Sequence, residues 1–317
     1  MAIACARVAI AEGGIWVVHH GGEWHRVTAL PPDASTGDLI RFSDAHDILA
    51  TPLERVAPDI TRAALSPVTA RQQLIFQLGN FHTHLREIGV RDTASVRNVF
   101  FAKAPSSLAP ASGTLKCPPE VRLLDYEIEL GLVLRRDARG PIDVDAAQIG
   151  DWVAGLTIVN DVSARDVQLR DGQYFRGKSF RGFCRVGPLL LLLEHRDWQR
   201  LDELRLTLAV NGQTRQDCLF SDRVHPPHRA LSDLSRFMDF QTGDLLATGT
   251  PGGCAIRAPA LWVQRLFGLL PEDVRWRMFL GRQATSRRYL KAGDRIEASI
   301  FTADGALELG RQILEVT

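Results

Sequence analysis

The sequence has few cysteines, and they follow no pattern. Five occur in 317 residues, at positions 5, 117, 184, 218 and 254, and no two have a Cys-x-x-Cys spacing. An odd and scattered set of thiols argues against both a disulfide scaffold and a zinc ribbon. It favours free thiols and a cytoplasmic location.

An excess of charge of either sign is also missing. Lysine and arginine total 38, aspartate and glutamate total 37, and the formal net charge is +1. This balance excludes the electrostatic footprint of a nucleic-acid or anionic-membrane binder. The longest apolar run, residues 188–193, is far shorter than the roughly 18 residues of a membrane helix, and no signal peptide is recognisable. We therefore expect a cytoplasmic protein that binds neither nucleic acid nor membrane.

The apolar segments predict a strand-dominated α+β protein. Residues 7–18 and 23–30 indicate a hairpin, and a soft boundary near residue 70 separates a small N-terminal β domain (1–70) from a larger domain (71–317). Strands do not alternate with long helices as a doubly wound sheet would require. In the larger domain we predict strands at 121–134, 152–160, 186–193, 204–211, 244–247, 295–301 and 307–316, and helices at 145–151, 162–169 and 227–238.

Paired carboxylates are the sharpest local feature. In Asp125-Tyr-Glu127-Ile-Glu129, Glu127 and Glu129 lie two residues apart on a predicted strand and therefore share a face. Two buried carboxylates repel each other, and a divalent cation with oxygen ligands would resolve that repulsion. The alternative is an amphipathic strand whose polar face meets water.

A third carboxylate, Asp161, stands where an apolar strand passes into a helix. Asp161, Arg165 and Gln168 follow at i, i+4 and i+7, so a carboxylate, a cation and an amide would share one helix face. In the alternative interpretation Asp161 only caps the helix and Arg165 pairs with a nearby acid.

Three further features suggest chemistry. His84 and Glu87 are three residues apart, so the glutamate could make the histidine a better general base, although a surface pair or a metal pair of His82 and His84 would also fit. Lys178 stands between Phe175 and Phe180, where it could stabilise an oxyanion or simply extend along the surface. The glycine-rich turn around Thr250 does not end as a phosphate loop does, and it favours close approach to another ligand.

In their joint order these features resemble the fumarylacetoacetate hydrolase family. The resemblance covers nearly everything after residue 65. It rests on Gly79-Asn80-Phe81 with His84 and Glu87, Phe101-Ala-Lys103-Ala-Pro-Ser106, Asp125-Tyr-Glu127-x-Glu129, Asn160-Asp161-Val-Ser-Ala-Arg165-Asp-x-Gln168, Gly177-Lys178-Ser-Phe180, Gly187-Pro188, Val210-Asn211-Gly212, Gly243-Asp244, Thr248-Gly249-Thr250-Pro251 and Lys291-Ala-Gly293-Asp294.

The resemblance implies a mixed β-sandwich roll, a homodimer and a set of roles for the residues of the site. Glu127, Glu129 and Asp161 would hold a divalent cation, Mg²⁺ or else Mn²⁺ or Ca²⁺. The other roles are water activation by His84 and Glu87, oxyanion stabilisation by Lys178, and substrate contact by Arg165, Gln168 and Thr250.

From this we predict a Mg²⁺-dependent hydrolase that cleaves a C–C bond of a β-diketo acid, such as an acylpyruvate-like 2,4-dioxo acid. The alternatives are a lyase or isomerase of the same family, an oxaloacetate-type decarboxylase or a 2-oxo acid tautomerase. A catalytically silent ligand-binding member is a third possibility.

The sequence departs from the family pattern at three places. Phe81 replaces the usual tyrosine, and Arg181 stands where aspartate is common. The connection at about 256–289 is long, and segments 258–270 and 271–283 predict two short amphipathic helices. Either these helices only pack on their own domain, or they form one wall of the substrate entrance, where arginines at 257, 265, 275 and 277 could meet a second carboxylate.

Overall fold

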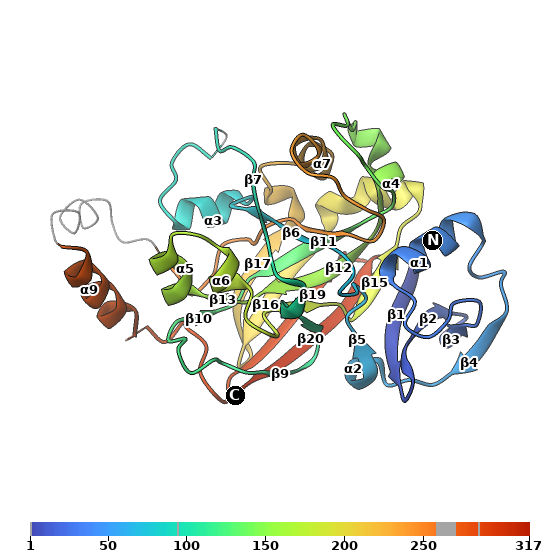
Figure 1. Ribbon diagram of the computed structural model, residues 1–317, viewed down its shortest axis with the longest axis horizontal. Coiled ribbons are helices and arrows are strands. Elements are labelled where there is room, and N and C mark those ends of the chain that lie inside the picture. Colours follow the sequence, from blue (N-terminus) through green and yellow to red (C-terminus); the bar gives the residue numbers. More distant parts are fainter. Residues whose placement is uncertain (1, 94, 258–270, 285) are drawn as a thin grey trace.

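A computed structural model describes residues 2–93, 95–257, 271–284 and 286–317 (Figure 1). Among these residues strands predominate, as the sequence predicts, and they form a large sheet, a five-stranded sheet and a two-stranded ribbon. Figure 1 shows the N-terminal strands at one side of the molecule and helix α9 at the opposite side. No helix in the described ranges is both long and apolar enough to span a membrane.

The large sheet carries the residues that matter most for the site. Its central strand β11 is buried along its whole length, which explains its nearly continuous apolar sequence. The order of its main path is β4 (Leu53–Val56), β3 (Glu23–Val27), β2 (Gly13–His20), β1 (Ile3–Ile10), β15 (Leu189–Leu192), β12 (Val153–Asp161), β11 (Ile128–Leu134), β18 (Leu245–Ala247), β6 (Leu74–Leu78) and β7 (Val99–Ala102), and β5 (Ala64–Leu65), β8 (Leu108–Pro110) and β14 (Cys184–Val186) join beside it.

The N-terminal strands are part of this sheet, because β1 pairs antiparallel with β15. Backbone hydrogen bonds therefore connect the two parts of the chain on either side of the expected boundary near residue 70.

The five-stranded sheet covers one face of the large sheet. Its order is β17 (Gln213–Leu219), β16 (Arg205–Val210), β19 (Arg295–Phe301), β20 (Glu308–Val316) and β9 (Gly113–Leu115). Buried and partly exposed residues alternate along β19, as expected of a strand with one face in the core. Its inward side chains, such as Ile296 and Ile300, join one core cluster with Leu130 and Leu132 of β11.

Short helices surround the sheets. They are α1 (Thr36–Ala45), α2 (Ile60–Ala63), α3 (His82–Glu87), α4 (Ile149–Trp152), α5 (Arg165–Asp171), α6 (Phe175–Lys178), α7 (Pro227–Ser235) and α9 (Glu272–Ala284), with 3₁₀ turns at Pro105–Ser107, Ala146–Gln148, His195–Glu203 and Phe220–Asp222. The ribbon β10 (Leu124–Asp125) and β13 (Ser163–Ala164) lies next to α5 and α6.

The structure corrects two of the predicted strands. Residues 7–18 are not a single strand: they comprise the end of β1, a turn at residues 11–12 and the start of β2, where Gly13 adopts a φ of 130° that other residues avoid. Segment 121–134 divides into β10 and β11, so that Glu127 lies in the break between them. Helix α9 confirms the predicted helix at 271–283, whereas the helix expected at 258–270 lies outside the described residues.

Candidate active site

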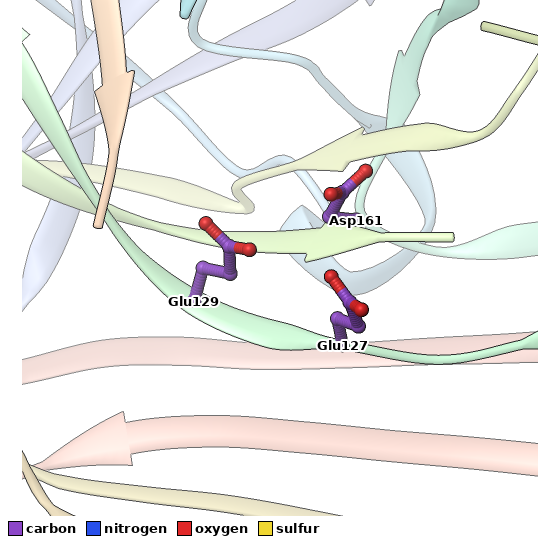
Figure 2. Close-up of side chains that lie close together, drawn as sticks. All are labelled: Glu127, Glu129 and Asp161. Carbon is purple, nitrogen blue, oxygen red and sulfur yellow. The ribbon is translucent and has the colours of Figure 1, made fainter. Parts of the chain in front are cut away.

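Three carboxylates lie together at the adjoining ends of β11 and β12. Glu127 precedes β11, Glu129 is its second residue, and Asp161 ends β12 (Figure 2). One oxygen from each carboxylate lies within 4.8 Å of the others, and all three side chains are buried. The structure thus brings together the three residues that the sequence nominates as metal ligands.

Two buried lysines partly neutralise this carboxylate cluster. Lys178 Nζ donates hydrogen bonds to Glu127 Oε2 at 2.6 Å and Asp161 Oδ2 at 2.5 Å. Lys103 Nζ donates to Asp161 Oδ1 at 2.5 Å and to the carbonyl of Phe183 at 2.7 Å. Asp161 therefore has an ammonium group on each of its oxygens, while Glu129 accepts a hydrogen bond from neither lysine.

Arg165 links the cluster to a fourth carboxylate, Asp125. Its Nε donates to Asp125 Oδ2 at 2.8 Å, its Nη2 contacts Glu127, and its Nη1 donates to Gln168 Oε1 at 3.0 Å. Asp125 also accepts the backbone N–H groups of Ala255 and Ile256. Arg165 and Gln168, expected to contact substrate, are thus part of the buried network that fixes the cluster and the start of the long connection.

The two glutamates of the cluster experience opposite electrostatic environments. Burial raises the pKa of Glu127, but the charges of Arg165 and Lys178 outweigh it and hold the pKa below its ordinary value. Burial, together with the neighbouring charges of Asp161 and Glu127, raises the pKa of Glu129 well above its ordinary value. Of the three, Glu129 is the carboxylate whose charge the surrounding protein compensates least.

His84 lies on α3 beside this network and is 8% exposed. Burial lowers the pKa of its imidazole, which the nearby carboxylate of Glu127 only partly opposes, so the ring is neutral near pH 7. Its Nδ1 faces the Cys254 thiol at 3.9 Å, and burial raises the pKa of that thiol well above its usual range. No described residue hydrogen-bonds Nε2, which leaves this nitrogen for a ligand.

Glu87 is on the same helix but is directed elsewhere. Its Oε2 accepts the backbone N–H of Gly253 at 2.8 Å, and its Oε1 accepts from Arg257 Nη2 at 3.3 Å. Among the described residues no hydrogen bond joins His84 to Glu87. The structure therefore places the two expected partners one turn apart on α3 without the contact that the sequence suggested.

Thr250 is held by a residue to which the sequence analysis assigned no role. Gln216 of β17 donates from Nε2 to Thr250 Oγ1 at 2.8 Å, and its Oε1 accepts the N–H of Ile128 at 3.0 Å. Gln216 thus ties the glycine-rich turn to the start of β11. Nothing in its local sequence signals this position, because the contact joins residues far apart in the chain.

The environment of Lys178 differs from the one expected. Phe175 is 54% exposed, so it does not enclose the lysine, whose ammonium lies 5.5 Å from the ring centre of Phe101 on β7. Lys103 was part of the family resemblance but had no assigned role. It directly follows the apolar strand segment Phe100-Phe101-Ala102, which was the one local signal that it might be buried.

The donor set fits a hard divalent cation. Three carboxylates with no thiol or imidazole among them suit Mg²⁺, Mn²⁺ or Ca²⁺ better than zinc. Within the described ranges, Glu129 accepts one hydrogen bond, from the N–H of Gly249 at 2.9 Å, and so keeps capacity for a cation. Such an ion would supply the missing positive charge and act as a Lewis acid.

This fold and site define the class of protein. A family model described as "Fumarylacetoacetate (FAA) hydrolase C-terminal" matches residues 74–316, and the chain belongs to the fumarylacetoacetate hydrolase family. Its structure is also similar to the fumarylacetoacetate hydrolase of the psychrophile Exiguobacterium antarcticum, with a TM-score of 0.74, 26% identity and 99% coverage of both chains.

Two relatives in sequence carry other activities in their names. The chain is 30% identical over 237 residues to the oxaloacetate tautomerase YisK of Bacillus subtilis. This alignment covers 74% of this chain and 68% of that protein. It is 34% identical over 189 residues to a bifunctional isomerase/decarboxylase of 4-hydroxyphenylacetate degradation from Salmonella dublin. This second alignment covers 58% of this chain and 42% of that protein. These relatives support an enzyme that acts on a small organic acid.

Proposed function

We propose that this protein catalyses keto–enol tautomerisation of an oxaloacetate-type 2-oxo acid, with a divalent cation held by Glu127, Glu129 and Asp161. The observation that carries the proposal is the buried imidazole of His84 beside the carboxylate cluster, whose pKa burial lowers, with Glu87 hydrogen-bonded to Gly253 and Arg257. The names of the similar proteins support tautomerisation at least as well as the hydrolysis that the sequence analysis put first.

The chain's own residues supply what an enolisation needs. The free Nε2 of neutral His84 takes the proton from the carbon next to the 2-oxo group. Lys178 has three N–H donors and uses two of them on Glu127 and Asp161, so the third can donate to the oxygen that gains charge. The cation, when bound, polarises the 2-oxo group as a Lewis acid.

Hydrolysis would place a further demand on this site. A water molecule must be deprotonated and directed at a carbonyl carbon, and the expected His84–Glu87 dyad would do this. In the structure Glu87 instead bonds Gly253 and Arg257. Decarboxylation shares the enolate with tautomerisation and needs no attacking water, so it is the second candidate, favoured by the relative from Salmonella dublin.

A small substrate panel tests the proposal. Oxaloacetate and an acylpyruvate are each incubated with the protein in Mg²⁺ and in EDTA. The enol is followed by its ultraviolet absorbance, and carbon dioxide and the released acid are assayed as separate products. In a freshly dissolved, enol-rich sample we expect the enol signal to relax to the keto–enol equilibrium faster in Mg²⁺ than in EDTA, without either product. Acylpyruvate cleavage as the dominant activity would replace the proposal by the hydrolase.

Substitutions on α3 separate the roles of its two candidate bases. We expect His84→Asn to lower tautomerisation about 10²-fold or more, because a general base typically contributes that much. Glu87→Gln should lower it less than about tenfold, since Glu87 makes no contact with His84. Initial rates at saturating Mg²⁺ measure both. Equal losses in the two variants would show that Glu87 acts on His84 during turnover.

A further inference from the structure

A polar pocket lies beside the turn that Glu87 binds. Its volume is about 360 Å³, and it is lined by α3, β17 and the Gly252–Gly253 turn. Arg257 and Arg288 complete it, and they stand at the two ends of the long connection. The connection therefore begins and ends at the same pocket, although Arg257 and Arg288 are 31 positions apart in the sequence.

The pocket carries more positive than negative charge. Its lining includes three guanidinium groups, from Arg215, Arg257 and Arg288. Glu87 pairs with Arg257, and the other acid in the lining, Asp217, already makes two hydrogen bonds to Arg205, at 2.6 and 2.7 Å. Two guanidinium groups thus remain without a carboxylate partner in the described part of the chain.

Arg215 is the most telling of the three. Its Nε is buried, and no hydrogen-bond partner for it occurs among the residues that the structure describes. The Nε atoms of Arg7, Arg26, Arg135 and Arg223 are also buried without a partner, so what distinguishes Arg215 is that it lines this pocket. The positive charges of Arg215 and Arg288 also act on Tyr126, whose hydroxyl donates to the carbonyl of Gly253 at 3.2 Å, which places both arginines near the turn.

From these observations we propose that Arg215, Arg257 and Arg288 form a binding site for a carboxylate or phosphate group. Guanidinium groups bind such oxyanions with charge-assisted and often bidentate hydrogen bonds. The backbone N–H groups of Gly252 and Gly253 already donate to Thr83 and Glu87, so the arginines supply the charged donors of the pocket. The anion is either the distal carboxylate of a dicarboxylic substrate, an assignment that rests on the proposed function, or a separate small anion.

Binding to the metal-free protein tests the site without any turnover. Calorimetry with inorganic phosphate and with succinate, which has two carboxylates and no 2-oxo group, is carried out on the wild type, Arg215→Gln, Arg288→Gln and the double variant. We expect each substitution to weaken binding about tenfold, because a hydrogen bond to a charged group contributes roughly that much. Arg287→Gln is the matched control: this exposed neighbour does not line the pocket, and the affinity should not change.

Kinetics then distinguish the two sources of the anion. If the distal carboxylate of the substrate binds here, Arg215→Gln raises KM for oxaloacetate about tenfold but not KM for 2-oxobutyrate, which has no second carboxylate. If a separate anion binds here, phosphate changes the rate of the wild type and not that of the double variant. Thermal unfolding confirms that each variant is folded. Absence of phosphate and succinate binding, or equal affinities in the wild type and the double variant, would overturn the proposal.

Discussion

Replacing Glu129 by alanine is expected to abolish Mg²⁺ binding and to lower the Mg²⁺-dependent rate by about 10³-fold or more, since Lewis-acid stabilisation contributes several kcal/mol to the transition state. Glu129 is the cluster member whose charge is compensated least, and so it gains most from a bound cation. Calorimetric titration with Mg²⁺ and initial rates measure the two effects.

Glu129→Gln is the matched variant for this prediction. The amide keeps the size of the side chain but removes a negative charge that is buried beside two other carboxylates. In EDTA we expect a melting temperature equal to or above that of the wild type, and in Mg²⁺ none of the wild type's upward shift. Mg²⁺ titration that is unchanged in both variants would refute the ligand assignment.

Replacing Lys103 by methionine is expected to cost up to about 3–5 kcal/mol of unfolding free energy in EDTA, because the buried carboxylate of Asp161 then keeps Lys178 as its one ammonium partner among the described residues. Lys103 holds one oxygen of Asp161 and the carbonyl of Phe183, and its ammonium lies 5.2 Å from the ring centre of Phe76. Saturating Mg²⁺ should reduce the loss, since a cation on Asp161 would supply part of the missing charge. Urea unfolding under both conditions measures this.

Lys116→Met controls for the removal of a lysine as such. Lys116 is exposed, so its substitution should change the unfolding free energy by no more than about 0.5 kcal/mol. If Lys103→Met behaves like this control, the pairing of Lys103 with Asp161 contributes nothing to folding.

Strand periodicity was enough to predict the strand-dominated fold and the shared face of Glu127 and Glu129, whereas the grouping of both with Asp161 followed from the family resemblance. Glu127 and Glu129 are two residues apart, so that local sequence already carries most of their placement, and Asp161 ends the neighbouring strand β12. The strand predicted at 295–301 is confirmed as β19, along which buried and more exposed residues alternate. Homodimerisation and the cytoplasmic location stay predictions.

Contacts between distant segments could not be read in the same way. Lys103 reaches Asp161 across 58 residues, Gln216 reaches Thr250 across 34, and Glu87 reaches Gly253 across 166. Each depends on how the sheet brings separate strands and turns together, and neither propensity nor spacing encodes that. The same reason explains why Phe101 and not Phe175 accompanies Lys178.

Proton exchange at carbon 3 of oxaloacetate is the most direct test of the central claim. Proton NMR in D₂O follows the loss of this signal with the wild type in Mg²⁺, with the wild type in EDTA and with His84→Asn in Mg²⁺. We predict rapid exchange only in the first sample, with the substrate otherwise intact. Exchange that persists in EDTA or in the His84 variant, or cleavage of the carbon skeleton in place of exchange, would contradict the account.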